Sequence, residues 1–273
     1  MATDWDQATR VTAPRGMSRT AAGSVWTRWL GREFSPRTEL ALFLLPFALM
    51  LVLLACRLVA RNAYMASIQE DALIETLQAA ILGLAAFFTF KAARVLAAAD
   101  ARLLSVLHLG LAACLALLCL EEISWGQRVF GIETLPWFQQ HNVQHEISLH
   151  NLEPVQGSLH SAYILLGLYG GLGFLWLRKP EHDARDWRRF CVPDWFCAGY
   201  FLPVAGAYLM LDKIAPYLHG NLGLEFFRIG NVFVWRDQEP AELLLWMGFI
   251  VLAYTNLVRA RRLAPLGDSG TTA

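Results

Sequence analysis

Charged residues are scarce in this sequence: Asp, Glu, Lys and Arg make up 17% of its 273 residues. A typical soluble domain carries about 25% charged residues, whereas here 56% of the residues are hydrophobic. Charges are missing above all from several long apolar runs, such as Leu103–Leu120. A run of this length can cross a bilayer core of ~30 Å. The deficit of charge therefore indicates an all-α, polytopic membrane protein and not a soluble domain.

Further absences narrow the class of protein. The 23 basic and 23 acidic residues balance, so no strongly charged partner is implied, and no nucleic-acid motif is present. The five cysteines form no CxxC pair and lie in or beside apolar runs, which is typical of small buried side chains and not of a disulfide framework. The sequence identifies no cofactor and no metal, and it leaves the oligomeric state open. Membrane lipid is the partner that we expect.

The apolar runs predict about six transmembrane helices, with two outer-face loops, 121–159 and 213–239, that contain short interfacial helices. This helical domain would cover residues 39–262, between a disordered or interfacial tail at 1–38 and a second tail at 263–273. Small residues in the fourth run, among them Gly167 and Gly170, favour close helix packing. The expected spans are Leu40–Cys56, Ala72–Phe90, Leu103–Leu120, Ser161–Leu177, Trp195–Leu211 and Ala241–Val258.

Lys and Arg residues are distributed unevenly between the two sides of this arrangement. Seventeen of the 23 fall in the N-terminal tail, the turn around residue 100, the basic loop 178–189 and the C-terminal tail. Because basic residues near span ends mark the cytoplasmic side, both termini should be cytoplasmic. The protein should then be integral to the cell (inner) membrane, with residues 121–159 facing outward.

Acidic residues stand at the outer ends of the expected spans, and two of them, Glu121 and Glu122, close the third span. At a helix N-terminus an acid is explained by capping and by the helix dipole, which suits Glu75 and Glu242. At a C-terminus the dipole disfavours negative charge, so Glu121 and Glu122 indicate a function or a specific buried partner. If the bundle is compact, these acids ring one outward-facing pocket, whose other polar residues would be Gln78, Gln127, Asn142, Gln144, Glu146 and Asn151.

A helix that continues beyond the third span would place Glu121 and Arg128 on one face, so that Arg128 neutralises Glu121. Glu122 would point elsewhere and act as a general acid or base. His150 lies where the loop returns to the membrane, and its ring should come within ~4 Å of a pocket carboxylate, with Glu122 the expected partner. Ser124 is a candidate nucleophile, although no local residue identifies its base. The candidate catalytic residues are therefore Glu122, His150, Glu121 and Ser124.

Two histidines in the same loop, His141 and His145, stand four residues apart. On a helix they would share a face and could hold a metal together with a carboxylate. The alternative is that both lie on a solvated interfacial face. We predict no metal from this spacing alone.

Residues 121–151 also form a recognisable pattern, carried by Glu121, Glu122, Ser124, Trp125, Gly126, Gln127, Gly131, Glu133, Thr134, Pro136, Asn142, Gln144, Glu146, Leu149, His150 and Asn151. The pattern resembles that of a group of uncharacterised bacterial multi-span membrane proteins, which reads E-E-x-S-W-G-Q, then a G-x-E-T-P-like turn, then N-x-Q-x-E-x-x-L-H-N. The resemblance implies a membrane location and no particular activity. A much weaker likeness links Glu121-x-x-Ser124 to the alkaline ceramidase-type membrane hydrolases, which hold zinc with Ser, Asp and three His. Their paired late-span histidines are absent from this sequence.

Three classes of function remain open at this point. The leading interpretation is a membrane-embedded hydrolase or transferase that acts on a lipid or lipid-linked substrate at the outer leaflet. A transporter or ion pathway would suit intramembrane carboxylates, but it should show polar residues deep in several spans, whereas mid-span positions here are almost all apolar. The third class is a non-catalytic scaffold for a larger membrane complex.

Overall fold

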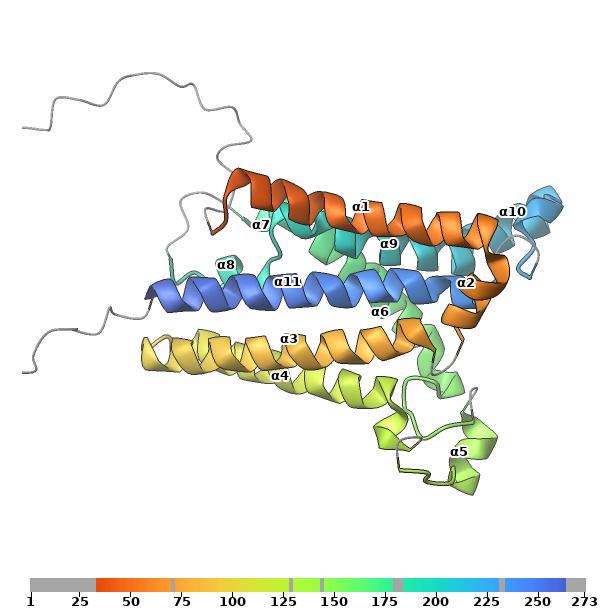
Figure 1. Ribbon diagram of the computed structural model, residues 1–273, viewed down its shortest axis with the longest axis horizontal. Coiled ribbons are helices and arrows are strands. Elements are labelled where there is room, and N and C mark those ends of the chain that lie inside the picture. Colours follow the sequence, from red (N-terminus) through yellow and green to blue (C-terminus); the bar gives the residue numbers. More distant parts are fainter. Residues whose placement is uncertain are drawn as a thin grey trace, which may run out of the picture.

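The computed structural model describes residues 33–69, 72–127, 130–142, 145–178, 184–230 and 234–263, so the two expected tails fall almost wholly outside it. Within these ranges the chain is helical and has no strand beyond an isolated bridge between Asn142 and Leu152. Long helices run side by side along the molecule (Figure 1). The principal helices are α1 (Pro36–Val59), α3 (Leu73–Ala98), α4 (Arg102–Glu122), α6 (Glu153–Leu172), α9 (Ala198–Leu209) and α11 (Glu239–Leu263).

Five helical segments of the described chain are long and apolar enough to cross a membrane: Pro36–Val59, Leu73–Ala98, Arg102–Glu122, Arg188–Leu222 and Arg236–Leu263. The prediction of an all-α, polytopic membrane protein is confirmed. The expected fourth span is not among the five. It is divided at Gly173 between α6 and the short helix α7 (Phe174–Leu177), which together lead from one end of the bundle towards the other (Figure 1).

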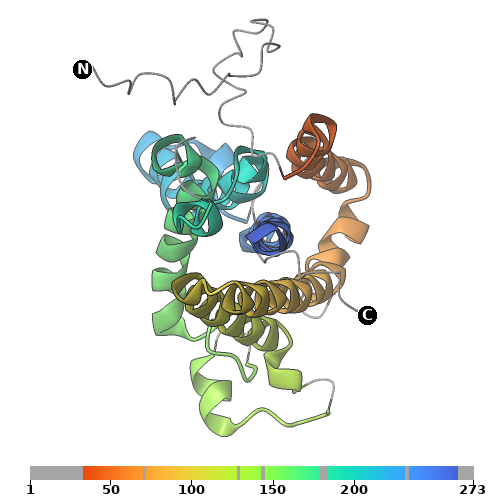
Figure 2. The ribbon, with the colours of Figure 1, turned by 90° about the vertical axis from the view of Figure 1, so that its left-hand side faces the viewer.

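Helix α11 occupies the centre of the bundle, with α3 and α4 on one side of it and α1, α6 and α9 around the rest (Figure 2). Its side chains are accordingly covered, as Trp246 shows with an exposed fraction of 1%. Helix α6 packs closely on α9 because its glycines leave room. A Cβ atom at Gly170 would stand 2.2 Å from the ring of Phe201, and one at Gly167 would stand 2.8 Å from the Phe201 carbonyl oxygen. The small residues of this run therefore permit the close approach that the sequence predicts.

The connecting segments gather at the two ends of the bundle. Short helices α2 (Arg61–Ser67), α5 (Pro136–His141) and α10 (Ala215–Leu222) lie at one end, which we call the loop end (Figure 1). The start of α1, the α3–α4 turn, helix α8 (Arg188–Cys191) and the last turn of α11 lie at the other end, which we call the basic end (Figure 1). Segments that the sequence assigns to one side of the membrane thus lie at one end of the fold.

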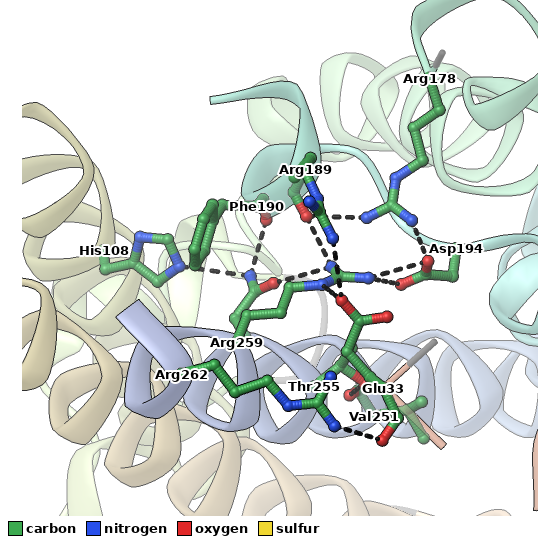
Figure 3. Close-up of polar contacts among 11 residues, drawn as sticks. Glu33, His108, Arg178, Arg189, Phe190, Asp194, Val251, Thr255, Arg259 and Arg262 are labelled. Carbon is green, nitrogen blue, oxygen red and sulfur yellow. Dashed lines mark hydrogen bonds and ion pairs between the residues drawn. The ribbon is translucent and has the colours of Figure 1, made fainter. Parts of the chain in front are cut away.

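A buried ion-pair network closes the basic end (Figure 3). Arg259 of α11 is 5% exposed, its Nε lies 2.8 Å from Glu33 Oε1, and its Nη2 lies 2.7 Å from Asp194 Oδ2. Arg178 also pairs with Asp194, and Arg189 Nη2 lies 3.4 Å from Glu33 Oε1. Burial alone would raise the pKa of Glu33, but the guanidinium groups of Arg259 and Arg189 lower it to about 2. The network ties the start of α1 and the α7–α9 connection to the end of α11.

Candidate functional site

The chain leaves α4 through a strained turn. Ser124 and Trp125 have φ angles of 47° and 55°, in the left-handed region that costs a non-glycine residue roughly 1–2 kcal/mol. Gly126 follows with a φ of 76°, which glycine adopts at no steric cost. The expectation of a helix that continues and puts Glu121 and Arg128 on one face is therefore wrong. Arg128 itself lies outside the described residues.

Glu121 is held by the loop that returns to the membrane. Its Oε1 accepts a hydrogen bond from Trp125 Nε1 at 2.6 Å. Its Oε2 accepts from the backbone N–H groups of Leu149 and His150 at 2.6 and 3.1 Å, and lies 3.2 Å from His150 Nδ1. The ring of His150 is thus within the expected distance of a carboxylate, but its partner is Glu121 and not the neighbouring Glu122.

Glu146 is the centre of a second set of hydrogen bonds. Its Oε1 accepts from Ser148 Oγ and from Asn151 Nδ2, both at 2.9 Å, and its Oε2 accepts from the hydroxyl of Ser124. The side chain of Asn142 donates to the Ser148 carbonyl at 2.8 Å. Glu146 is 3% exposed, and a buried carboxylate is stable only with donors of this kind. We call the contacts of Glu121 and Glu146, together with those of Gln127, the loop network.

Gln127 joins two parts of the loop. Its Oε1 accepts from the backbone N–H of Ile147 at 2.7 Å, and its Nε2 donates to the hydroxyl of Thr134. Ser124 is 2% exposed, and its hydroxyl donates to Glu146 within the loop. The structure therefore gathers most of the predicted polar residues of 121–151, but it uses them to shape the loop. Gln144 lies outside the described residues.

Glu122 lies apart from the hydrogen bonds of this network. It is within electrostatic range of Glu75 on α3 and of Glu239 and Glu242 on α11, and also of Glu146. We call Glu75, Glu122, Glu239 and Glu242 the carboxylate cluster. Adjacent residues on a helix point about 100° apart, which explains why Glu122 and its neighbour meet different parts of the protein.

Hydroxyl and amide groups of α3, α6 and α9 reach the carboxylate cluster. Tyr208 of α9 donates a hydrogen bond to Glu242, and Tyr163 of α6 bonds the same carboxylate. Gln78 of α3 is fully buried, and its Nε2 donates to the Glu239 carbonyl at 3.0 Å and to Glu239 Oε2 at 3.2 Å. Three of the predicted pocket residues (Glu75, Gln78 and Glu242) are thus assembled at one place with Glu122.

The sequence did not predict the two tyrosines, because each lies near the end of an apolar run and counts as part of it. Asp212 is one of the acids expected at the outer span ends, but its partner was not predicted: His160 Nδ1 lies 2.9 Å from Asp212 Oδ2, and the His160 ring centre lies 4.8 Å from that of Tyr208. Asp212 belongs to the π-helical segment Met210–Ile214, an irregularity that is frequent at functional sites. The spacing of these residues could have indicated the site. His160 and Tyr163 are separated by about one helical turn, as are Tyr208 and Asp212, so each pair lies on one face of its helix.

His141 and His145 do not share a helix face. Helix α5 ends at His141, whose Nδ1 lies 2.8 Å from the Trp137 carbonyl and whose ring stacks on Trp137 with centroids 4.7 Å apart. His145 has a φ of 57°, and its Nδ1 lies 2.7 Å from the Gln139 carbonyl. The idea of a metal held by this pair on one helix is therefore wrong. Elsewhere in the described ranges, no group of three or more His, Cys, Asp or Glu side chains is placed to hold a metal.

Comparison with known proteins does not add to this geometry. No protein-family model, curated protein or solved structure matches the chain.

Proposed function

We propose that the protein is a membrane-embedded enzyme that acts by acid–base catalysis on a lipid or lipid-linked substrate at the outer leaflet. One observation carries the proposal. Glu122 makes no hydrogen bond in the described part of the chain, and Glu75, Glu239 and Glu242 lie within electrostatic range of it. A carboxylate that no hydrogen bond holds, with other carboxylates around it, suits a group that must both give and take a proton. In this proposal Glu122 is the general acid or base.

The other candidate residues take different roles. Tyr208 donates its single O–H to Glu242, so in this proposal it holds the Glu242 carboxylate in place and is a positioning residue. Glu121 and His150 bond each other and hold the loop against the end of α4, so they are positioning residues. Supporting contacts of this kind fix the geometry of a reacting group.

Lipid profiling tests this proposal. The full-length protein would be reconstituted in vesicles of native bacterial lipids, and the lipids would be compared by mass spectrometry before and after incubation. We expect at least one species to be consumed, with the rate reduced about 100-fold in Glu122→Gln. Glu133→Gln is the matched control, because Glu133 is an exposed acid of the same loop. Absence of turnover in the wild type, or turnover that survives Glu122→Gln, would refute the proposal.

A second candidate, a proton pathway, is favoured by one continuous set of contacts. Asp212 pairs with His160, the ring of His160 lies against Tyr208, and Tyr208 donates to Glu242 beside Glu122. Chains of this kind relay protons in membrane proteins. Vesicles with an entrapped pH dye would distinguish the candidates: proton flux that is lost in His160→Phe supports the pathway, and lipid turnover without flux supports the enzyme.

We also propose that the basic end faces the cytoplasm and that the membrane is the inner membrane. The support is the position of Arg178, Arg189, Arg259 and Arg262 at that end, since basic residues mark the cytoplasmic side (Figure 3). The loop end, with the carboxylate cluster, would then face the outer leaflet.

A further inference from the structure

A groove separate from the carboxylate cluster opens between α1, α9 and α11. Its cavity has a volume of about 580 Å³ and is lined mainly by aliphatic side chains. Ala241 and Leu244 of α11 line the groove, whereas Glu242 of the same helix bonds Tyr208 on another face. The groove and the cluster are therefore two sites on different faces of the central helix.

The groove lies in surface that would face lipid. Only 6% of the most apolar stretch of α1 is buried by the rest of the protein, and α1 stands at the rim of the bundle (Figure 2). Leu54 and Leu58 line the groove from α1 and are 51% and 74% exposed. Within a bilayer, surface of this kind contacts acyl chains, because the hydrocarbon core holds no water. The volume lies in the range of small-molecule sites, roughly 300–1,000 Å³.

The end of the groove near α2 is polar. Arg57, in the last turn of α1, forms an ion pair with Asp237, and the Tyr64 hydroxyl donates to the same carboxylate at 3.0 Å. The Arg57 guanidinium lies 5.5 Å from the centre of the Tyr64 ring, and the Arg57 side chain is 23% exposed. Burial raises the pKa of Tyr64, so its hydroxyl remains a donor. The apolar groove thus ends at an ion pair whose guanidinium is partly exposed, and a lipid that carries a phosphate has the same sequence of an apolar chain and a polar end.

We propose that this groove binds a phospholipid of the outer leaflet, with one acyl chain between α1, α9 and α11 and the phosphate at Arg57. Arginine suits a phosphate because its planar guanidinium donates hydrogen bonds in pairs. The inference goes beyond the proposed reaction and does not depend on it, because Glu122 does not line the groove.

Two glycines provide a matched test of occupancy. Gly206 of α9 lines the groove, and a Cβ atom there would meet nothing within 4 Å, so Gly206→Leu should fill the groove without displacing protein atoms. Gly110 of α4 has the same free space and does not line the groove, which makes Gly110→Leu the control. The full chain would be placed in nanodiscs of phosphatidylethanolamine and phosphatidylglycerol. A phosphatidylglycerol probe with a diazirine in its acyl chain would be cross-linked by light, and the labelled peptides would be mapped by mass spectrometry.

We expect labelling of α1, α9 and α11 to fall about tenfold in Gly206→Leu, equivalent to about 1.4 kcal/mol of binding, and to be unchanged in Gly110→Leu. Leu54→Trp fills the groove from α1 and should give the same loss if Gly206→Leu does not fold. Labelling equal to wild type in the folded groove variants would overturn the proposal. So would labelling spread evenly over all lipid-facing helices.

Arg57→Gln tests the assignment of the phosphate. A diacylglycerol probe with the same diazirine chain lacks the phosphate and should label wild type and Arg57→Gln equally. With the phosphatidylglycerol probe, labelling of Arg57→Gln should be about tenfold weaker than labelling of wild type, as expected for the loss of a hydrogen bond to a charged group. An equal effect on the two probes, including no effect on either, would contradict a phosphate site at Arg57.

Discussion

The two adjacent carboxylates at the end of α4 should respond differently to the same substitution. The oxygens of Glu121 face the Trp125 indole N–H, the backbone N–H groups of Leu149 and His150, and a ring nitrogen of His150. Glu121→Gln removes the charge and replaces one oxygen by an amide group that can only donate. At least one of the surrounding N–H groups would then face another donor. Glu122→Gln removes no hydrogen bond among the described residues.

The expected cost of Glu121→Gln is about 3 kcal/mol. A hydrogen bond to a charged group contributes about 1.5–3 kcal/mol, and a buried donor left unsatisfied costs about 1–3 kcal/mol. Glu121 is 8% exposed, and its contacts share a single carboxylate, so they are coupled and do not add as separate energies. Glu122→Gln should change the free energy of unfolding by less than about 0.5 kcal/mol, because it breaks no hydrogen bond among the described residues.

The reactivity of a buried thiol provides the assay. Cys197 is fully buried, so it reacts with a fluorogenic maleimide only when the bundle opens; the other four cysteines would be replaced by Ser in every variant. The midpoint of thermal opening in detergent should fall by about 6–12 °C in Glu121→Gln, since 1 kcal/mol corresponds to about 2–4 °C for a chain of this size. It should move by less than about 2 °C in Glu122→Gln. If the thermal midpoint fell equally in Glu121→Gln and Glu122→Gln, the proposed difference between Glu121, which the loop holds, and Glu122, which it does not, would be refuted.

The basic end and the topology allow further tests. Arg259→Gln leaves Glu33 and Asp194 without their shared partner and should lower the free energy of unfolding by about 3–5 kcal/mol. In the same thermal assay, substitution of the exposed Arg261 by Gln should have almost no effect. If the two substitutions lowered the thermal midpoint equally, the ion pairs of Arg259 would not be what stabilises this end. Because the pKa of Glu33 is lowered from 4.5 to about 2, its contribution is complete above about pH 4.5 and is lost as the pH falls towards 2. The thermal midpoint should therefore drop over that range, and it should drop less in Glu33→Gln. Reporter fusions after residue 185 should read cytoplasmic and fusions near residue 140 external; an external reading at 185 would reverse the orientation.

The spans are predictable because hydropathy depends on each residue and its close neighbours. The run Leu103–Leu120 lies within α4, and the run Ala241–Val258 lies within α11. Helix ends are less predictable, because they depend on contacts made far along the chain. Helix α3 continues to Ala98, well beyond the expected end at Phe90. The turn after α4 requires positive φ at Ser124, a residue type with no strong preference for that conformation.

The polar residues of the site were predictable as a group, but their partners were not. An acid at the end of an apolar run needs a partner, and Glu121 has one in the returning loop, whereas Glu122 makes no hydrogen bond among the described residues. Which donor each acid meets depends on the path of the loop, which composition does not determine. The pairing of Glu33 with Arg259 spans most of the chain and has no local signal. Tyr208 has an apolar body, so hydropathy conceals the hydroxyl that reaches the carboxylate cluster.

Glu121 and Glu122, the last two residues of α4, have different surroundings. Because successive helical residues point about 100° apart, Glu121 and Glu122 cannot both face the returning loop. Backbone strain of the kind found after them persists only where the surroundings over-determine the conformation, and here the hydrogen bonds to Glu121 and Glu146 supply that support. The same contacts fix the last turn of α4 and with it the direction of Glu122. The loop network therefore positions Glu122 through the backbone, because Glu122 makes no hydrogen bond to the part of the loop that the structure describes.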